Sequence, residues 1–221
     1  SPDQTSKLIV ATDSAYDPAT GIIYYSSLRS IIKQYPQTGT ITAHPTCVLE
    51  IMAIDEKSGE VLFEPTPVSD SSGALEITYP ALKMLNVGGY TYVFFSSQDP
   101  TTDRVTIYSA YCTPSGVRSP LFLDRFLYVS NKQMLGQTWD VLPLGDDVIA
   151  LAGIGTVSAS TSAIVRFYTL SLIGSLGAYT LDFSGTSSQA KKCCTLSRTS
   201  KPVSGSDYPE LMLVAIGTTE D

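Results

Sequence analysis

Residues 46–65, TCVLEIMAIDEKSGEVLFEP, contain the clearest strand–turn–strand pattern in the sequence and decide the fold class. Two apolar arms flank a polar loop at 55–59, which ends in Gly59, a residue that readily takes the positive φ angle of such loops. Apolar residues occupy both alternating faces of the first arm, which indicates a strand covered on both sides. The pattern predicts a β-hairpin in the middle of the core.

The rest of the chain repeats this pattern of short apolar runs between turns. We expect strands at 7–12, 22–32, 74–79, 90–96, 105–111, 121–129, 148–154, 163–173, 179–183 and 211–216. Residues 80–85 fit one helical turn, and the polar stretch 184–207 fits an exposed excursion. Turns at short, regular spacing predict an all-β fold, either an antiparallel β-sandwich or a compact β-barrel with long surface loops.

Length and composition indicate one ordered domain. The 221 residues contain no linker-like stretch, so we expect a single all-β domain that spans residues 1–221. Hydrophobic residues make up 43% of the chain and charged residues 16%, which supplies a sizeable core and excludes intrinsic disorder. Thirteen tyrosines fit strands rather than long amphipathic helices.

Charge and hydropathy argue against two kinds of partner. The formal net charge is −7, and a nucleic-acid-binding surface needs clustered Lys and Arg, so nucleic acid is not expected as a partner. No apolar run reaches the roughly 18–20 residues that span a bilayer, so no membrane insertion is expected. The chain begins at Ser1 without a methionine, and we expect a processed product or an excised fragment.

No arrangement of reactive side chains predicts catalysis. His44 is the only histidine, and the sequence has no G-x-S-x-G serine for which it could act as the base. We interpret His44 as a loop or strand-end residue. Asp146 and Asp147 suit a general acid or a hard-cation site, but adjacent strand residues point to opposite faces, which favours a solvated turn. Gly153 and Gly155 lack the third glycine of a dinucleotide site. We therefore predict no enzyme activity, no cofactor and no metal.

The four cysteines are Cys47, Cys112, Cys193 and Cys194, and they lack the C-x-x-C spacing of zinc sites. Adjacent cysteines seldom bond to each other, because the ring is strained. We favour reduced cysteines, and a bridge between Cys47 and Cys112 is the alternative.

Trp139 is the only tryptophan and the one candidate receptor-binding residue. It lies between Gly136 and Pro143 in a turn-rich stretch, where an aromatic side chain suits a ligand or interface anchor. The alternative is a side chain that closes the edge of the core. The same two interpretations stay open for Tyr24, Tyr25, Tyr90, Tyr92 and Tyr128.

The acidic, Tyr- and Thr-rich chain, its strand–acidic turn–strand unit at 46–65, the hairpins that follow and the C-terminal GTTED at 217–221 resemble the capsid spike (protruding) domain of astroviruses. The resemblance covers the whole chain as an outline and assigns no site residue. It implies a viral capsid protein on the virion surface, made in the host cytoplasm, that forms homodimers and has no catalytic activity. It further implies attachment to a host-cell receptor and recognition by neutralising antibodies.

A secreted or phage carbohydrate-binding module is the alternative function, followed by a β-sandwich glycoside hydrolase. A carbohydrate-binding module predicts exposed aromatic side chains. A glycoside hydrolase predicts a cleft with two carboxylates at a fixed separation.

Composition also favours self-association. Because few residues are charged, the surface must expose apolar, Tyr, Thr and Ser groups, and surfaces of this kind form interfaces. Residues 164–172 are apolar on both faces and are the candidate homodimer interface, with a covered sandwich face as the alternative.

Overall fold

The computed structural model describes residues 6–32, 46–70, 73–74, 76–78, 81–99, 104–117, 121–127, 139–145, 147–157, 160–170, 174–181, 189–202 and 209–219. Within these ranges the strands pair in antiparallel fashion and no helix occurs, which confirms the all-β prediction. The sheets are open and compatible with a β-sandwich, so the barrel alternative is wrong for this part of the chain.

The chain divides into two compact units, Ser1–Arg125 (unit 1) and Phe126–Asp221 (unit 2). Each unit has its own sheets and its own buried apolar cluster. The expectation of one domain over residues 1–221 stays a prediction, and the two units are described in turn.

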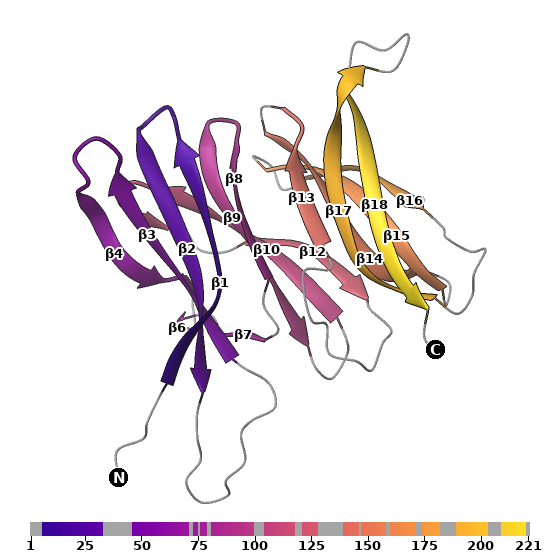
Figure 1. Ribbon diagram of the computed structural model, residues 1–221, viewed down its shortest axis with the longest axis horizontal. Helices are drawn as coiled ribbons and strands as arrows, with labels where there is room; N and C mark the ends of the chain where they lie inside the picture. Colours follow the sequence, from indigo (N-terminus) through magenta and orange to yellow (C-terminus); the bar gives the residue numbers. More distant parts are fainter. Residues whose placement is uncertain are drawn as a thin grey trace, which may run out of the picture. The chain divides into compact units, whose positions relative to one another are not determined.

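The first sheet of unit 1 contains five strands (Figure 1). Its order is β1 (Ser6–Asp17), β2 (Ile22–Ile32), β3 (Thr46–Asp55) and β4 (Val61–Pro67), and β7 (Glu76–Thr78) also pairs with β3. The predicted hairpin at 46–65 is therefore present as β3, turn and β4. A small pair, β5 (Ser69–Asp70) with β6 (Gly73–Ala74), follows β4.

The second sheet of unit 1 is built on the predicted hairpin of β9 (Tyr90–Asp99) and β10 (Arg104–Thr113). On one side β9 pairs with β8 (Ala81–Val87), and on the other β10 pairs with β11 (Gly116–Val117) and β12 (Leu121–Leu127). The helical turn expected at 80–85 is wrong for residues 81–85, which belong to β8. Leu82, Met84 and Val87 are buried against their neighbours there, and this packing overrides the local preference.

The two sheets of unit 1 share one core. Alternate residues of β3, among them Leu49 and Ile51, face the same cluster as Val93 and Phe95 of β9, and all four are at most 1% exposed. Phe95 stacks on Tyr108 of β10 with ring centroids 5.3 Å apart. The shared cluster thus buries the facing sides of the two sheets, which is the packing of a β-sandwich. On the opposite side of the second sheet, Phe94 and Ile107 are buried as well.

The two arms of the predicted central hairpin have different surroundings. β3 lies between β2 and the β4–β7 side of the sheet, so its central position is confirmed. β4 is wrongly placed in that prediction, because it is an edge strand whose residues are mostly exposed. Pro65 and Pro67 lack the N–H groups that an edge strand offers to other chains, and such residues are typical of protected edges.

Unit 2 contains a four-stranded sheet and a two-stranded ribbon. The sheet order is β13 (Trp139–Pro143), β14 (Val148–Val157), β15 (Ser160–Thr169) and β16 (Gly174–Leu181). The ribbon consists of β17 (Gln189–Pro202) and β18 (Pro209–Thr219). The buried carboxylate of Asp140 joins the two, because it accepts the N–H of Val141 at 2.9 Å on β13 and that of Leu196 at 2.8 Å on β17.

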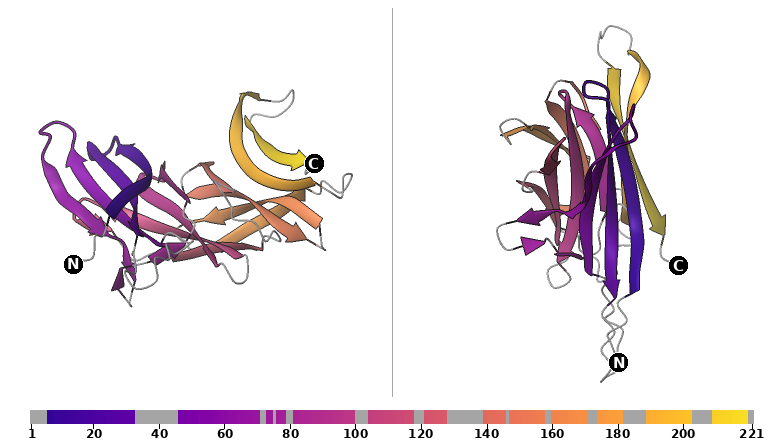
Figure 2. Two further views of the ribbon diagram at one scale, coloured as in Figure 1. Left: turned by 60° about the horizontal axis from the view of Figure 1, so that its bottom comes forward. Right: turned by 90° about the vertical axis from the view of Figure 1, so that its left-hand side faces the viewer.

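Part of the polar stretch at 184–207 is a strand. The expected exposed excursion is wrong for residues 189–202, which form β17 (Gln189–Pro202) and pair with β18 (Pro209–Thr219). The ribbon bends along its length (Figure 2), and its pairing register shifts at two places. Such irregularities bend a strand, which accounts for the curvature of the ribbon.

The position of Ile51 in the shared core predicts the cost of shortening it. Ile51→Ala should lower the free energy of unfolding by about 2–5 kcal/mol, because the cavity forms where both sheets meet. The matched control is Val61→Ala on β4, 42% exposed, which should change it by less than about 0.5 kcal/mol. Denaturant titration followed by circular dichroism measures both, and equal losses would place β3 outside the core.

Candidate binding surface

Three turns of unit 1 meet at one end of its strands, at the top of Figure 1: residues 18–21 between β1 and β2, 56–60 between β3 and β4, and 88–89 between β8 and β9. We call this region the turn end. Tyr16 links the three turns, because its hydroxyl donates to Glu56 Oε2 at 2.7 Å and its backbone carbonyl accepts a hydrogen bond from Asn86 Nδ2. The N–H of Glu56 also donates to the carbonyl of Gly21 at 2.9 Å. The turns therefore form one hydrogen-bonded surface.

A buried aspartate closes the first of these turns. Asp17 is 7% exposed, and its carboxylate accepts the N–H of Ala19 at 3.0 Å and the hydroxyl of Thr20 at 2.6 Å. Gly21 completes the reversal with a φ of 70°, in the region that favours glycine. The short side chain of aspartate suits this role, because it reaches backbone N–H groups two or three residues ahead.

Asp55 closes the second turn in the same way. Its Oδ1 accepts the N–H of Ser58 at 2.7 Å, the hydroxyl of Ser58 at 2.8 Å and the N–H of Lys57 at 3.0 Å. These hydrogen bonds, led by those of Ser58, lower the pKa of Asp55 below its usual 3.8. The charged form of Asp55 therefore helps to hold the turn that carries Glu56.

The outer face of the first sheet carries an apolar patch beside the turn end. Tyr16 on β1 lies opposite Ile23 on β2. Ile23 lies opposite Ile54 on β3, which in turn lies opposite Val61 on β4. Because facing residues share one face of a sheet, these four side chains form a row across all four strands.

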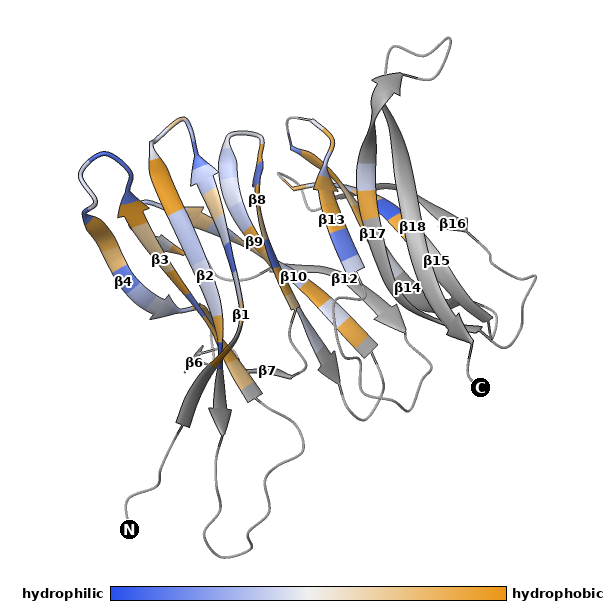
Figure 3. Ribbon diagram, in the orientation of Figure 1, coloured by the Kyte–Doolittle hydropathy of each residue, from blue (hydrophilic) through white to orange (hydrophobic). Residues whose placement is uncertain are grey.

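A second row below it adds Tyr25 of β2, which lies opposite Met52 of β3. We call the six residues the outer patch: Tyr16, Ile23, Tyr25, Met52, Ile54 and Val61. Tyr16 is 44% exposed, Val61 is 42% exposed, and the other four are half-buried. In Figure 3, the hydrophobic colour of β2, β3 and β4 next to their turns marks the part of the first row that these strands supply.

A tyrosine cluster lies on the second sheet. Tyr90, which follows the two positive-φ residues Gly88 and Gly89, is 53% exposed. Its ring meets Tyr111 edge to face, with centroids 5.1 Å apart and an interplanar angle of 87°. Tyr92 lies 5.7 Å from Tyr111 on the same face. The exposed ring of Tyr90 therefore packs against the half-buried ring of Tyr111, which in turn packs against Tyr92.

The predicted receptor-binding candidate, Trp139, lies elsewhere. It is the first residue of β13 rather than a loop residue, and it is 1% exposed. Its Nε1 is buried without a hydrogen-bond partner among the described residues. This burial agrees with the core interpretation of Trp139, and no residue of the turn end belongs to its unit.

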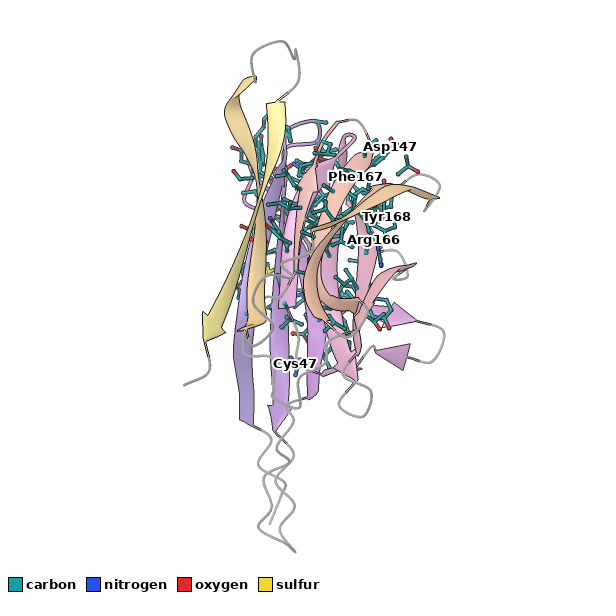
Figure 4. The ribbon with its side chains drawn as sticks, turned by 90° about the vertical axis from the view of Figure 1, so that its right-hand side faces the viewer. Cys47, Asp147, Arg166, Phe167 and Tyr168 are labelled. Carbon is teal, nitrogen blue, oxygen red and sulfur yellow. The ribbon has the colours of Figure 1, made fainter. Side chains whose placement is uncertain are left out.

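The other candidate residues are placed as follows. Asp147 lies at the end of the β14–β15 pair (Figure 4), where its carbonyl accepts the N–H of Leu170 at 2.9 Å. Asp146, His44 and Tyr128 lie outside the described residues. Tyr24 is buried in the core of unit 1, and Tyr25 belongs to the outer patch. In the part of the chain that the structure describes, no group of three or more His, Cys, Asp or Glu is arranged to hold a metal ion.

Cys47 and Cys112 are buried in the core of unit 1, and no disulfide joins them. Burial raises the pKa of Cys47 to about 11 and that of Cys112 to about 12, so both are protonated at neutral pH. The prediction of reduced cysteines is confirmed for this pair. Cys193 and Cys194 lie on β17 opposite Ile216 and Ala215.

Comparison with known proteins assigns no relationship. No protein-family model matches the sequence, and neither a curated protein nor a solved structure is significantly similar to it. Among the described residues, no helix is long and apolar enough to cross a membrane.

Sequence reasoning missed the outer patch. Its residues belong to predicted strands, but only the pairing register brings Tyr16, Ile54 and Val61 into one row. The available signal was the alternation of β2 and β3, where Ile23 and Ile54 adjoin the buried Ile22 and Ala53. Apolar residues on both sides of a strand had indicated a second buried face.

The lowered pKa of Asp55 predicts a pH-dependent contribution to stability. A carboxyl group whose pKa is lower in the folded than in the unfolded chain stabilises the fold above pH 3.8, and this contribution is lost as the pH falls through its folded-state pKa. The Tm of Asp55→Asn should therefore lie below that of the wild type at pH 7, and the gap should narrow on acidification below pH 3.8.

Glu60→Gln is the matched control, because it removes the same charge from the same turn and breaks no side-chain hydrogen bond in the described structure. A Tm gap for Asp55→Asn that stays constant with pH, or that Glu60→Gln reproduces, would contradict this role of the Asp55 carboxylate.

Proposed function

We propose that this chain is a viral capsid spike domain of the astrovirus type, displayed on the virion surface, and that it attaches to a host-cell receptor through the turn end of unit 1. The observation that carries the proposal is the outer patch, which places six apolar or aromatic side chains on an accessible sheet face beside three linked turns. Exposed apolar patches with polar surroundings mark interaction sites.

The scaffold supports recognition because the contact residues are held by strands and by fixed turns. Tyr16 and Val61 are on strands of the sheet that buries Ile51, and Glu56 is in a turn fixed by Asp55. A surface that is already ordered loses little conformational entropy on binding. Tyr and Met are enriched at the centres of interfaces, as Tyr25 and Met52 are here.

The carbohydrate-binding alternative rests on Tyr90. Its ring is exposed and is supported edge to face by Tyr111, an arrangement that leaves one aromatic surface open to a sugar. This function would use the second sheet of unit 1 rather than the outer patch. Variants at Tyr90 and Val61 therefore separate the two functions.

Homodimers and recognition by neutralising antibodies belong to the same proposal, as does the absence of catalysis. The candidate dimer segment at 164–172 includes Val165, Tyr168 and Leu170, which are 7%, 6% and 8% exposed. Side chains this buried offer little contact area, so these three residues fit the covered-face interpretation better than an interface.

Attachment is tested with the labelled, purified chain on a panel of vertebrate cell lines and on a glycan array. Saturable binding to at least one cell line is expected, and Val61→Asp should weaken it at least tenfold, because a desolvated carboxylate would lie in the patch. Thr12→Asp, at another exposed site on the outer face of β1, is the control and should leave binding unchanged.

Glycan binding that Tyr90→Ala abolishes and Val61→Asp leaves intact would favour the carbohydrate-binding module instead. Absence of saturable binding to every cell line and glycan would contradict the attachment function.

A further inference from the structure

We propose that the outer patch and Glu56 form a docking site for a protein segment that carries an arginine or lysine beside apolar side chains. The inference deepens the proposed attachment function, on which it rests, by naming the chemistry of the partner. The docking site has an apolar part, on the sheet, and a cation-binding part, at the turn.

The apolar part has the size of an interface centre. Strands lie about 4.8 Å apart and same-face residues about 7 Å apart along a strand, so each residue covers about 34 Å² of the sheet face and the six residues of the outer patch cover roughly 200 Å². A stable interface takes about 800 Å² from each partner. The outer patch therefore supplies the apolar centre, and the turns beside it supply the polar rim.

The cation-binding part is the pair of Tyr16 and Glu56. The Tyr16 hydroxyl donates to Glu56 Oε2 at 2.7 Å, so an exposed carboxylate is held beside an exposed ring. The N–H of Glu56, bonded to the carbonyl of Gly21 at 2.9 Å, fixes the backbone under this pair. A guanidinium group can lie on such a ring and bond to the carboxylate at once.

The charges around the docking site determine which sign of charge the partner must carry. The adjoining turn carries the carboxylates of Asp55, Glu56 and Glu60 against the single ammonium of Lys57. Arg29 and Glu50 on the same face compensate each other's charge, because Arg29 donates to Glu50 through two hydrogen bonds of 2.5 and 3.0 Å. The field at the patch is therefore negative and attracts a cationic segment.

The same charges disfavour a second copy of this chain on the patch. A two-fold pair whose axis runs parallel to the strands would bring two acidic turns against each other, and like charges at an interface oppose association. An anionic ligand is disfavoured for the same reason. A cationic protein segment remains the occupant that both the apolar patch and its charges fit.

The test uses an extended synthetic peptide of alternating leucine and arginine, and its matched partner with glutamate in place of arginine, titrated against the purified chain by fluorescence anisotropy. The arginine peptide should bind, the glutamate peptide should not, and affinity should fall as salt is raised. Glu56→Gln should weaken binding by about tenfold, a loss of about 1.4 kcal/mol. Glu60→Gln, which removes the same charge away from the Tyr16 ring, should have a smaller effect.

Equal binding of both peptides, or equal effects of Glu56→Gln and Glu60→Gln, would overturn the cation-binding site. Light scattering gives the second check. A mass of twice 23.7 kDa that Val61→Asp returns to 23.7 kDa would make the patch a self-association surface and overturn the proposal. Thermal melts confirm that each variant is folded.

The two proposals fail separately. If cells bind the chain through Val61 but binding is independent of salt and of Glu56, the attachment function stands and the cationic partner is wrong. If the arginine peptide binds through Glu56 and no cell binds the chain, the site exists and the attachment function is wrong.

Discussion

The burial of one face of β3 between two sheets is the constraint on which unit 1 depends. Leu49 and Ile51 are at most 1% exposed and belong to the same cluster as Val93 and Phe95 of the other sheet. Because side chains of a strand alternate, this burial also fixes which residues of β2, β3 and β4 face outward. A register slip of one residue would bury the outer patch and expose the core.

The turn end follows from that register. Once Tyr16 faces outward from β1, its hydroxyl reaches Glu56, and its carbonyl meets the side chain of Asn86 from the second sheet. The edges of the two sheets are also joined, since Asp13 Oδ2 accepts the N–H of Met84 at 2.7 Å. These hydrogen bonds convert three separate hairpin turns into one ordered surface next to an apolar sheet face.

Much of the fold could be predicted from the sequence, because β-branched and aromatic runs between Gly, Pro and Asp turns have few alternatives. The errors arose where local composition and tertiary pairing disagree. Residues 81–85 lack β-branched side chains but pair with β9, and most of the polar stretch 189–202 pairs with β18. The outer patch was out of reach for a different reason: Tyr16 and Val61 are far apart in sequence, and only register joins them.

Hydrogen–deuterium exchange, resolved by peptide, tests the arrangement of β3 and β4 most directly. If β3 lies inside the sheet and β4 at its edge, amides of 47–53 should exchange slowest in unit 1, and those of 62–64 should exchange orders of magnitude faster, because few partners cover an edge strand. Equal protection of the two strands, or faster exchange in β3, would contradict a fold organised around the buried face of β3.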